Sequence, residues 1–425
     1  MLANYFRTLF ENERDGIVQS GCIFDRSMER YTNFIYAAGS YSQNYVRQEQ
    51  YQSDEYDIEI LKRQGTGEVA VDLFVLASYS LSYIRRLFVL LEQKHIKTVI
   101  LPYLTPIQRL MIAECMPNAF GRRKEMIQFL DAPYHFLQEK NVEHIYLLYE
   151  NGTPISNVDS SLATGIHFEP VDETVQNLVD EMEGVHVPVV HAGYIFENQW
   201  IFYFGVYGSD ITQISKLVRE KWKEEIDQGK VGEATELFLK SFGRDAYGSI
   251  VMYHGPLYDH PTQIKSMMTG KVFHSSRSCM SYIPNDGLSC SMACQYHHDH
   301  DVMQNQKKHS FQYARYGTLL LGNINLRRYF SDIAMRFWEV RNQVRAIGLP
   351  NCCVEEYWNS QILKLIHGSD MIYWVCPVRK YTSTRALLQI ITESSFNRLI
   401  QVNAEYGFCI SGYLVPYDEE NQISD

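Results

Sequence analysis

The sequence predicts an α/β fold with two β-sheets, helices on the outside and one long insertion rich in Cys and His. Buried strand-like runs alternate with a segment of helical spacing over residues 69–116, and further apolar runs resume after residue 316. Residues 256–316 are polar and lack periodicity. The composition, 45% hydrophobic and 21% charged, is ordinary for a globular protein. We expect a single domain over residues 1–425 with an insertion at about 256–316 within it.

The first half of the chain predicts a hairpin followed by a β-α-β unit. Residues 17–43 alternate short apolar runs with Gly, Asn and Ser, a pattern typical of a hairpin that enters a loop. Residues 69–78 and 97–104 have the composition of buried strands, and residues 84–95 between them have helical spacing, so the two strands should be parallel. The next expected elements are a helix at 106–116, strands at 142–150 and 199–207, a helix at 211–241 and a strand at 248–255.

Regular structure is expected again after the insertion. Five segments recover the apolar pattern of strands and helices, at 317–325, 336–350, 371–378, 385–393 and 409–415. We find no internal repeat and no low-complexity linker between them. These segments therefore belong to the same domain as the first half.

Composition limits the classes of protein that the chain can belong to. No run of about 18 apolar residues is present to span a bilayer, and the N-terminal "MLANYFRTLFENERDG" lacks the pattern of a signal peptide. Nine Cys, an odd number, fit a reducing cytoplasm better than a disulfide framework. A formal net charge of −11 opposes binding to nucleic acid or anionic membranes. We expect the basic clusters Arg85–Arg86 and Arg122–Lys124 to be solvated surfaces, with nucleic-acid contacts as the alternative.

The order of the segments resembles the metallo-β-lactamase fold, in particular metallohydrolase-like proteins found beside prokaryotic defence genes. "FIYAAGS" is similar to the family's strand that ends in Asp-Cys-Gly-Ser, and "FVLASYSLSYIRRL" to the strand with the His-x-His/Asp-x-Asp-His metal motif. "VILPYLTPIQRLMI", "GTLLLGNI", "GLPNCCVEEYWN" and "KYTSTRALL" are similar to the segments that follow. The resemblance covers roughly residues 17–415, outside the insertion, and implies an αββα sandwich.

The positions that bind metal in that family carry other residues in this chain. A two-metal hydrolytic site needs imidazoles and carboxylates, and a neutral hydroxyl or amide is a poor substitute. Without two metal ions nothing generates the nucleophilic hydroxide, so hydrolysis by the family mechanism should be absent. We therefore expect a vestigial site with no catalytic residue and no cofactor, formed by Ser78, Ser80, Ser82, Tyr83, Asn323, Asn351, Cys352 and Ser383.

The insertion contains a candidate zinc site. Cys290, Cys294 and His297 form a C-x3-C-x2-H cluster, and Cys279 would complete a closed, tetrahedral Cys3His site of the structural kind. One structural zinc ion would explain an ordered insertion without a core of its own. The alternatives are a flexible His-rich loop and a catalytic metal.

Two further groups near the vestigial site allow more than one interpretation. Arg85 and Arg86 stand where relatives have small residues, and we expect surface cations; the alternatives are an anion-binding pair and cations that pair with acids in the vacated space. Tyrosine rings should fill the former cavity, with their hydroxyls paired locally. The tyrosines in question are Tyr79, Tyr83, Tyr357 and Tyr381.

The leading functional hypothesis is a non-catalytic metallo-β-lactamase-like protein that serves binding, assembly or sensing, with a protein partner and a role in anti-phage defence. The alternative is an active hydrolase of the nuclease or phosphodiesterase type that uses a relocated centre. Such a centre would be either the metal cluster of the insertion or Cys352 as a nucleophile. No His lies close to Cys352 in sequence, and free Cys is usually a small buried hydrophobe.

Overall fold

The structure is a computed structural model. The described residues are 4–13, 16–25, 30–39, 70–114, 116, 122–155, 164–197, 200–208, 224–225, 228, 230, 248–256, 269–274, 317–349, 357–366, 372–377, 389–390, 392–394, 397–402 and 406–414.

The first sheet has nine strands in the order β12-β17-β1-β2-β3-β4-β5-β6-β8. Neighbouring strands are antiparallel from β12 to β3 and parallel from β3 to β8. The strands are β1 Asn4–Glu13, β2 Gly16–Asp25, β3 Arg30–Gly39, β4 Val71–Leu76, β5 Ile96–Pro102, β6 His144–Asn151, β8 Val189–Ala192, β12 Thr269–His274 and β17 Tyr406–Leu414.

The second sheet has eight strands in the order β16-β15-β14-β13-β11-β10-β9-β7. It is parallel from β16 to β13 and antiparallel from β13 to β7. The strands are β7 Gly165–His167, β9 Tyr194–Glu197, β10 Trp200–Tyr207, β11 Ser249–Pro256, β13 Gly317–Leu320, β14 Val344–Gly348, β15 Ile372–Pro377 and β16 Asn397–Val402.

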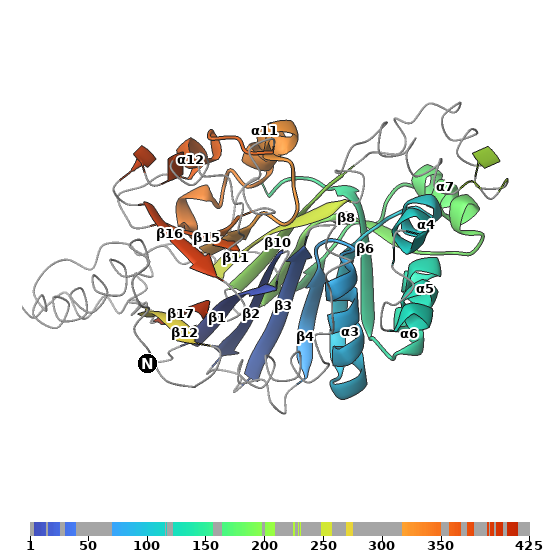
Figure 1. Ribbon diagram of the computed structural model, residues 1–425, viewed down its shortest axis with the longest axis horizontal. Helices are drawn as coiled ribbons and strands as arrows, with labels where there is room; N and C mark the ends of the chain where they lie inside the picture. Colours follow the sequence, from blue (N-terminus) through green and yellow to red (C-terminus); the bar gives the residue numbers. More distant parts are fainter. Residues whose placement is uncertain are drawn as a thin grey trace, which may run out of the picture.

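Three hydrophobic clusters arrange these sheets and the helices in layers (Figure 1). One cluster lies between the two sheets. A second packs the helices from α3 through α7 against the outer face of the first sheet, and a third packs α11 and α12 against the outer face of the second sheet. The order of layers is therefore helix, sheet, sheet, helix. The helices are α3 Leu81–Gln93, α4 Pro106–Glu114, α5 Arg123–Asp131, α6 Pro133–Glu139, α7 Glu173–Glu183, α11 Leu326–Arg336 and α12 Ile362–Leu365, and the 3-10 helix η3 is Arg341–Gln343.

Strand β4 shows why the sequence forms these layers. Leu73 and Val75 face the second sheet, whereas Phe74 and Leu76 face the helices. Because successive side chains of a strand point to opposite faces, a strand buried on both sides must be apolar throughout. The continuous apolar run before Ser78 therefore predicts a central strand of a sandwich.

Most of the predicted elements are confirmed among the described residues. β2 and β3 form the predicted antiparallel hairpin, and β4, α3 and β5 form the predicted β-α-β unit with a parallel pair. β6, β10, β11 and β13 lie at predicted strands. The helix predicted at 211–241 lies mostly outside the described residues.

Several described elements were not predicted from the sequence, namely α5 to α7, α12, β7 to β9 and β16, together with β1, α11 and β12. β1 precedes the hairpin and pairs with β2 and β17, and α11 follows β13. Thr269–His274 lie inside the predicted insertion but form β12, an edge strand paired with β17. A six-residue segment without apolar alternation becomes a strand because its neighbour supplies the hydrogen bonds, and a local pattern does not contain that information.

The class of fold is α/β with two mixed sheets and helices. Among the described helices, none has the length and apolar character needed to cross a membrane. The ends of β3, β4 and β5 lie at the same edge of the first sheet, because the three strands are parallel. The predicted vestigial site begins at this edge.

Candidate functional site

The side chain of Ser78, which follows β4, is hydrogen-bonded to the end of β3. Its hydroxyl donates a hydrogen bond to the carbonyl oxygen of Gly39 at 2.8 Å and accepts one from the Gly39 N–H at 3.1 Å. The side chain is only 3% exposed. A hydroxyl has one hydrogen and two lone pairs, so the only proton and one acceptor site are occupied by one residue of the neighbouring strand.

The next two predicted positions begin helix α3. Ser80 is the N-cap, but its side chain makes no capping hydrogen bond; its N–H donates to the Ser78 carbonyl at 2.8 Å. Ser80 is buried, and Ser82 in the first turn is half-buried. The backbone of this turn is thus held by local hydrogen bonds and by packing rather than by a side-chain cap.

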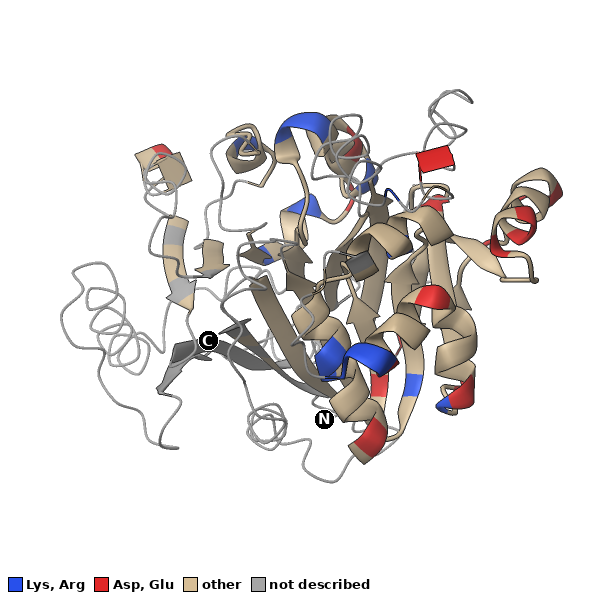
Figure 2. Cartoon of the chain, turned by 45° about the vertical axis from the view of Figure 1, so that its right-hand side comes forward, with Lys and Arg blue, Asp and Glu red and all other residues tan. Residues whose placement is uncertain are grey.

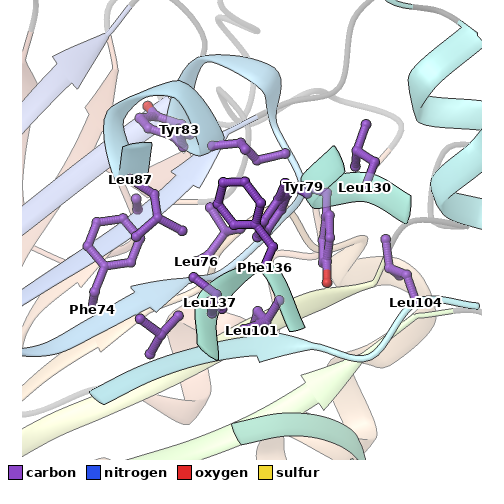
Figure 3. Packing of buried hydrophobic residues seen from close by; sticks show 14 of the residues in the cluster. Phe74, Leu76, Tyr79, Tyr83, Leu87, Leu101, Leu104, Leu130, Phe136 and Leu137 are labelled. Carbon is purple, nitrogen blue, oxygen red and sulfur yellow. The ribbon is translucent and has the colours of Figure 1, made fainter. Parts of the chain in front are cut away.

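Tyr83 packs against Gly39 on the helix side of the first sheet. A Cβ atom built on Gly39 would lie 2.3 Å from Cε2 of Tyr83 and 3.0 Å from Oγ of Ser80, so only glycine fits this approach of strand and ring. Figure 3 shows Tyr83 beside Leu87 and Tyr79 among Leu104, Leu130 and Phe136. Apolar and aromatic side chains therefore fill the space beneath the turn.

Arg86 does not lie on the surface, so the expectation of two surface cations is wrong for this residue. It is buried, with its guanidinium carbon 5.9 Å from the centroid of the Tyr83 ring. Arg85, in contrast, is half-buried. On a helix, residues three or four apart share a face. Arg86 follows Tyr83 by three positions and shares its inward-facing side.

Asn323 lies at the corresponding edge of the second sheet, just after β13. Its N–H donates to Oγ of Ser249 at 2.8 Å. Gly322 before it has φ +62°, and a Cβ there would lie 2.5 Å from that same Oγ. The positive φ and the close contact both require glycine, so the turn that presents Asn323 is fixed by backbone geometry.

The two strand ends are joined through β11. The N–H of Ile250 donates to the carbonyl of Ala77, the residue before Ser78, at 2.8 Å. The Tyr36 hydroxyl, from β3, donates to the Ile250 carbonyl at 2.6 Å. Burial raises the pKa of Tyr36 well above its ordinary value, which keeps the hydroxyl protonated as a donor. The structure therefore brings the turn of Ser78 and the turn of Asn323 to one edge of the sandwich.

The remaining predicted site residues lie outside the described part of the chain. This applies to Asn351, Cys352 and Ser383 of the vestigial site and to Tyr381. It also applies to the whole candidate zinc cluster of Cys279, Cys290, Cys294 and His297. No contact or role of these residues is described by the structure.

The described donors do not fit a site for two metal ions. They are two buried serine hydroxyls, one half-buried serine, a buried phenol and an amide, and the Ser78 hydroxyl is bonded to Gly39. Metal sites of this hydrolytic kind use imidazole nitrogens and carboxylate oxygens. Among the residues that the structure describes, no three His, Cys, Asp or Glu side chains are grouped to hold an ion.

The sequence matches no protein-family model and no curated protein. Interpretation of the site therefore depends on its own geometry. Residues that determine it but were not predicted are Gly39, Tyr36 and Ser249. The glycine in "AAGS" at the end of an apolar strand was a signal for a close backbone contact.

Proposed function

We propose that this protein is a non-catalytic member of the metallo-β-lactamase fold whose scaffold serves binding, assembly or sensing. The double hydrogen bond between Ser78 and Gly39 carries the proposal. A side chain at the metal-binding position of this fold must point its lone pairs at an ion, whereas Ser78 uses its hydroxyl to join two strands. The layer order and the position of the β4–α3 turn support the family resemblance.

The setting we propose is the cytoplasm of a prokaryote, as a subunit of an anti-phage system with a protein partner. The resemblance to metallohydrolase-like proteins beside defence genes supports this setting by association only. The insertion would contribute one structural zinc ion through Cys279, Cys290, Cys294 and His297.

Metal content together with hydrolytic activity tests the proposal. The purified full chain is analysed by inductively coupled plasma mass spectrometry and assayed with bis(p-nitrophenyl) phosphate and nitrocefin, with added zinc or manganese. We expect no hydrolysis and at most about one zinc ion per chain. About two ions per chain together with turnover of either substrate would falsify the proposal.

Two cysteine variants separate structural zinc from a relocated active centre. Cys290→Ser should remove the zinc ion, whereas Cys22→Ser, a change in strand β2 outside the cluster, should leave it bound. Activity that disappears in Cys290→Ser or Cys352→Ser would instead support the alternative, an active hydrolase with a relocated metal or cysteine centre.

A further inference from the structure

The net charge of the chain comes from one segment. Residues 141–215 hold eleven of the 50 Asp and Glu residues and none of the 39 Lys and Arg residues, so the remainder of the chain has 39 of each sign. This segment contributes β6 to β10 and α7, including β8 and β7, the last strands in the order of the two sheets. One end of the sandwich is therefore acidic.

Helix α7 presents an outward stripe at this acidic end. Glu173, Asn177 and Glu181 are exposed and spaced four residues apart, and Val185 just after the helix is 50% exposed. We call these four residues the acidic face. Figure 2 shows Asp and Glu and no Lys or Arg on this helix at the right-hand side of the molecule. The face combines two carboxylates with one apolar and one amide side chain.

A second surface, on α11 and the turn after it, has the opposite character. Met335 is 66% and Trp338 is 49% exposed, and they lie three positions apart. Arg328 is exposed on the same helix, and the guanidinium carbon of Arg341 lies 3.4 Å from the centroid of the Trp338 ring. We call these four residues the α11 face. Figure 2 shows Lys and Arg gathered around this helix at the top of the molecule.

The composition of the α11 face is typical of an interface rather than of a solvated surface. Residues 317–349 contain five Arg and no Lys. Protein interfaces are enriched in Trp, Met and Arg and depleted of Lys, and Trp and Arg are the commonest residues of high binding energy. A half-exposed Trp held in place by a stacked guanidinium is a rigid anchor that costs little conformational entropy to bind.

The charge pattern of the α11 region favours a protein surface over nucleic acid. Asp332 and Glu339 are exposed within the same region, and their carboxylates would repel a run of phosphates. A protein surface that carries separate carboxylates and an apolar residue would fit the arginines of the α11 face better than nucleic acid does. The acidic face of the same chain has this composition, with Glu173 and Glu181 about 12 Å apart along α7.

We propose that the α11 face of one copy binds the acidic face of a second copy. Arg328 and Arg341 pair with Glu173 and Glu181, and Trp338 packs on Val185. The two faces differ, so the contact is heterologous, and repetition of it gives a ring or an open chain of subunits. This inference goes beyond the proposed function and holds whether or not the protein is catalytic.

Sedimentation velocity of the full chain tests the association. At about 50 mM NaCl, assemblies larger than a monomer should increase with protein concentration, and at about 500 mM NaCl they should decrease because salt screens the pairs at the rim. The double variants Arg328→Gln/Trp338→Ala and Glu173→Gln/Glu181→Gln should each weaken self-association at least about tenfold.

Mixing the two double variants distinguishes this contact from other causes of association. Each variant retains one intact face, so a mixture in equal amounts should form a dimer of one copy of each and nothing larger. The matched control, Lys124→Gln/Glu139→Gln, changes exposed charges on α5 and α6 and should assemble as the unaltered protein does. Circular dichroism confirms that each variant is folded.

Several results would overturn the proposal. One is a monomer at every salt concentration up to about 100 μM protein. Others are assembly that neither double variant weakens, and a mixture of the two variants that stays monomeric. Binding of a fluorescein-labelled single-stranded oligonucleotide to a monomeric protein, lost in Arg328→Gln/Trp338→Ala, would assign the α11 face to nucleic acid instead.

Discussion

Arg109 in one helical layer and Arg336 in the other are both buried, and the protein compensates their charges in different ways. Arg109 on α4 makes a two-pronged ion pair with Glu183 at the end of α7, at 3.0 Å and 2.7 Å, and also donates to the carbonyls of Leu104 and Asp131. Arg336, at the end of α11, donates to three backbone carbonyls, and none of the described carboxylates forms an ion pair with it. These carbonyls belong to Phe204, Gly152 and Ala192.

The two arginines also connect different elements of the fold. The Arg109 pair joins α4 to α7 within one layer of helices, and the carboxylate of Glu183 supplies the negative charge. Arg336 connects α11 to β10 of the second sheet and to β8 of the first, and its guanidinium lies 4.8 Å from the centroid of the Tyr203 ring. Burial lowers the pKa of Arg336 from its ordinary value, but carbonyl dipoles and an aromatic ring stabilise the cation.

The largest effect is expected from removal of the negative partner of Arg109. Glu183→Ala leaves a buried guanidinium without its carboxylate, and the free energy of unfolding should fall by about 3–5 kcal/mol. Urea denaturation followed by circular dichroism measures it. Thr174→Ala, exposed on the same helix, is the control and should change stability by less than about 0.5 kcal/mol. A loss below about 1 kcal/mol for Glu183→Ala would contradict the role of the pair.

A smaller loss is expected at the other arginine. Arg336→Met removes the buried charge together with its donors, so three carbonyls lose a partner but no ion is left unpaired. The expected loss is about 2–4 kcal/mol, measured by the same urea transitions. Asp332→Asn, at an exposed position of the same helix, is the control. Equal losses for Glu183→Ala and Arg336→Met would remove the distinction between the two kinds of compensation.

His254 is another buried base, and it remains neutral, so no buried charge has to be compensated. His254 lies between the sheets with its Nε2 2.7 Å from Oε1 of Gln19 and its ring stacked on Trp200. Burial lowers the pKa of His254 from 6.5 to about 3. The unfolded chain therefore binds a proton below about pH 6.5 that the folded chain does not bind.

The contribution of His254 to stability should thus be complete above pH 6.5 and lost as the pH falls towards 3. The slope is at most about 1.4 kcal/mol per pH unit, which gives a loss of roughly 2 kcal/mol by pH 5. Urea transitions from pH 7.5 to 4.5 compare the unaltered protein with His254→Phe. The variant should lose less stability over this interval, and parallel curves would show that His254 is not the titrating group.

The smallest effect is expected at the uncharged turn. Ser78→Ala removes the hydroxyl that links β4 to β3 and should cost about 1–2 kcal/mol, because the Gly39 groups lose a buried partner. Metal content should not change. Ser82→Ala in the half-buried first turn of α3 serves as the comparison and should cost less. A change in bound metal in Ser78→Ala would instead assign a ligand role to its oxygen.

The strands and the location of the candidate turn could be predicted because local patterns determine them. The apolar run that ends at Ser78 and the helical spacing after it predict a strand, a turn and a helix in that order. The burial of Arg336 could also have been predicted, since it follows Leu326 and Ile333 on the apolar face of α11.

Other features depend on contacts between distant parts of the chain, and a local pattern does not identify the partner. The contact of Gly39 with Tyr83 and that of Gly322 with Ser249 form only after the sheets and α3 have packed. The bond between Ile250 and Ala77 joins residues far apart in sequence. β12 is a strand only because β17 lies beside it.

The contact between Gly39, Ser78 and Tyr83 limits the paths open to this protein in evolution. A histidine at position 78 would lose both hydrogen bonds to Gly39 and would need room in a turn that is already filled. The ring of Tyr83 occupies the space that any side chain larger than glycine at position 39 would need. Several substitutions would have to occur together before a side chain in this turn could bind a metal ion. A single substitution would thus not turn this packed turn into a metal-binding one.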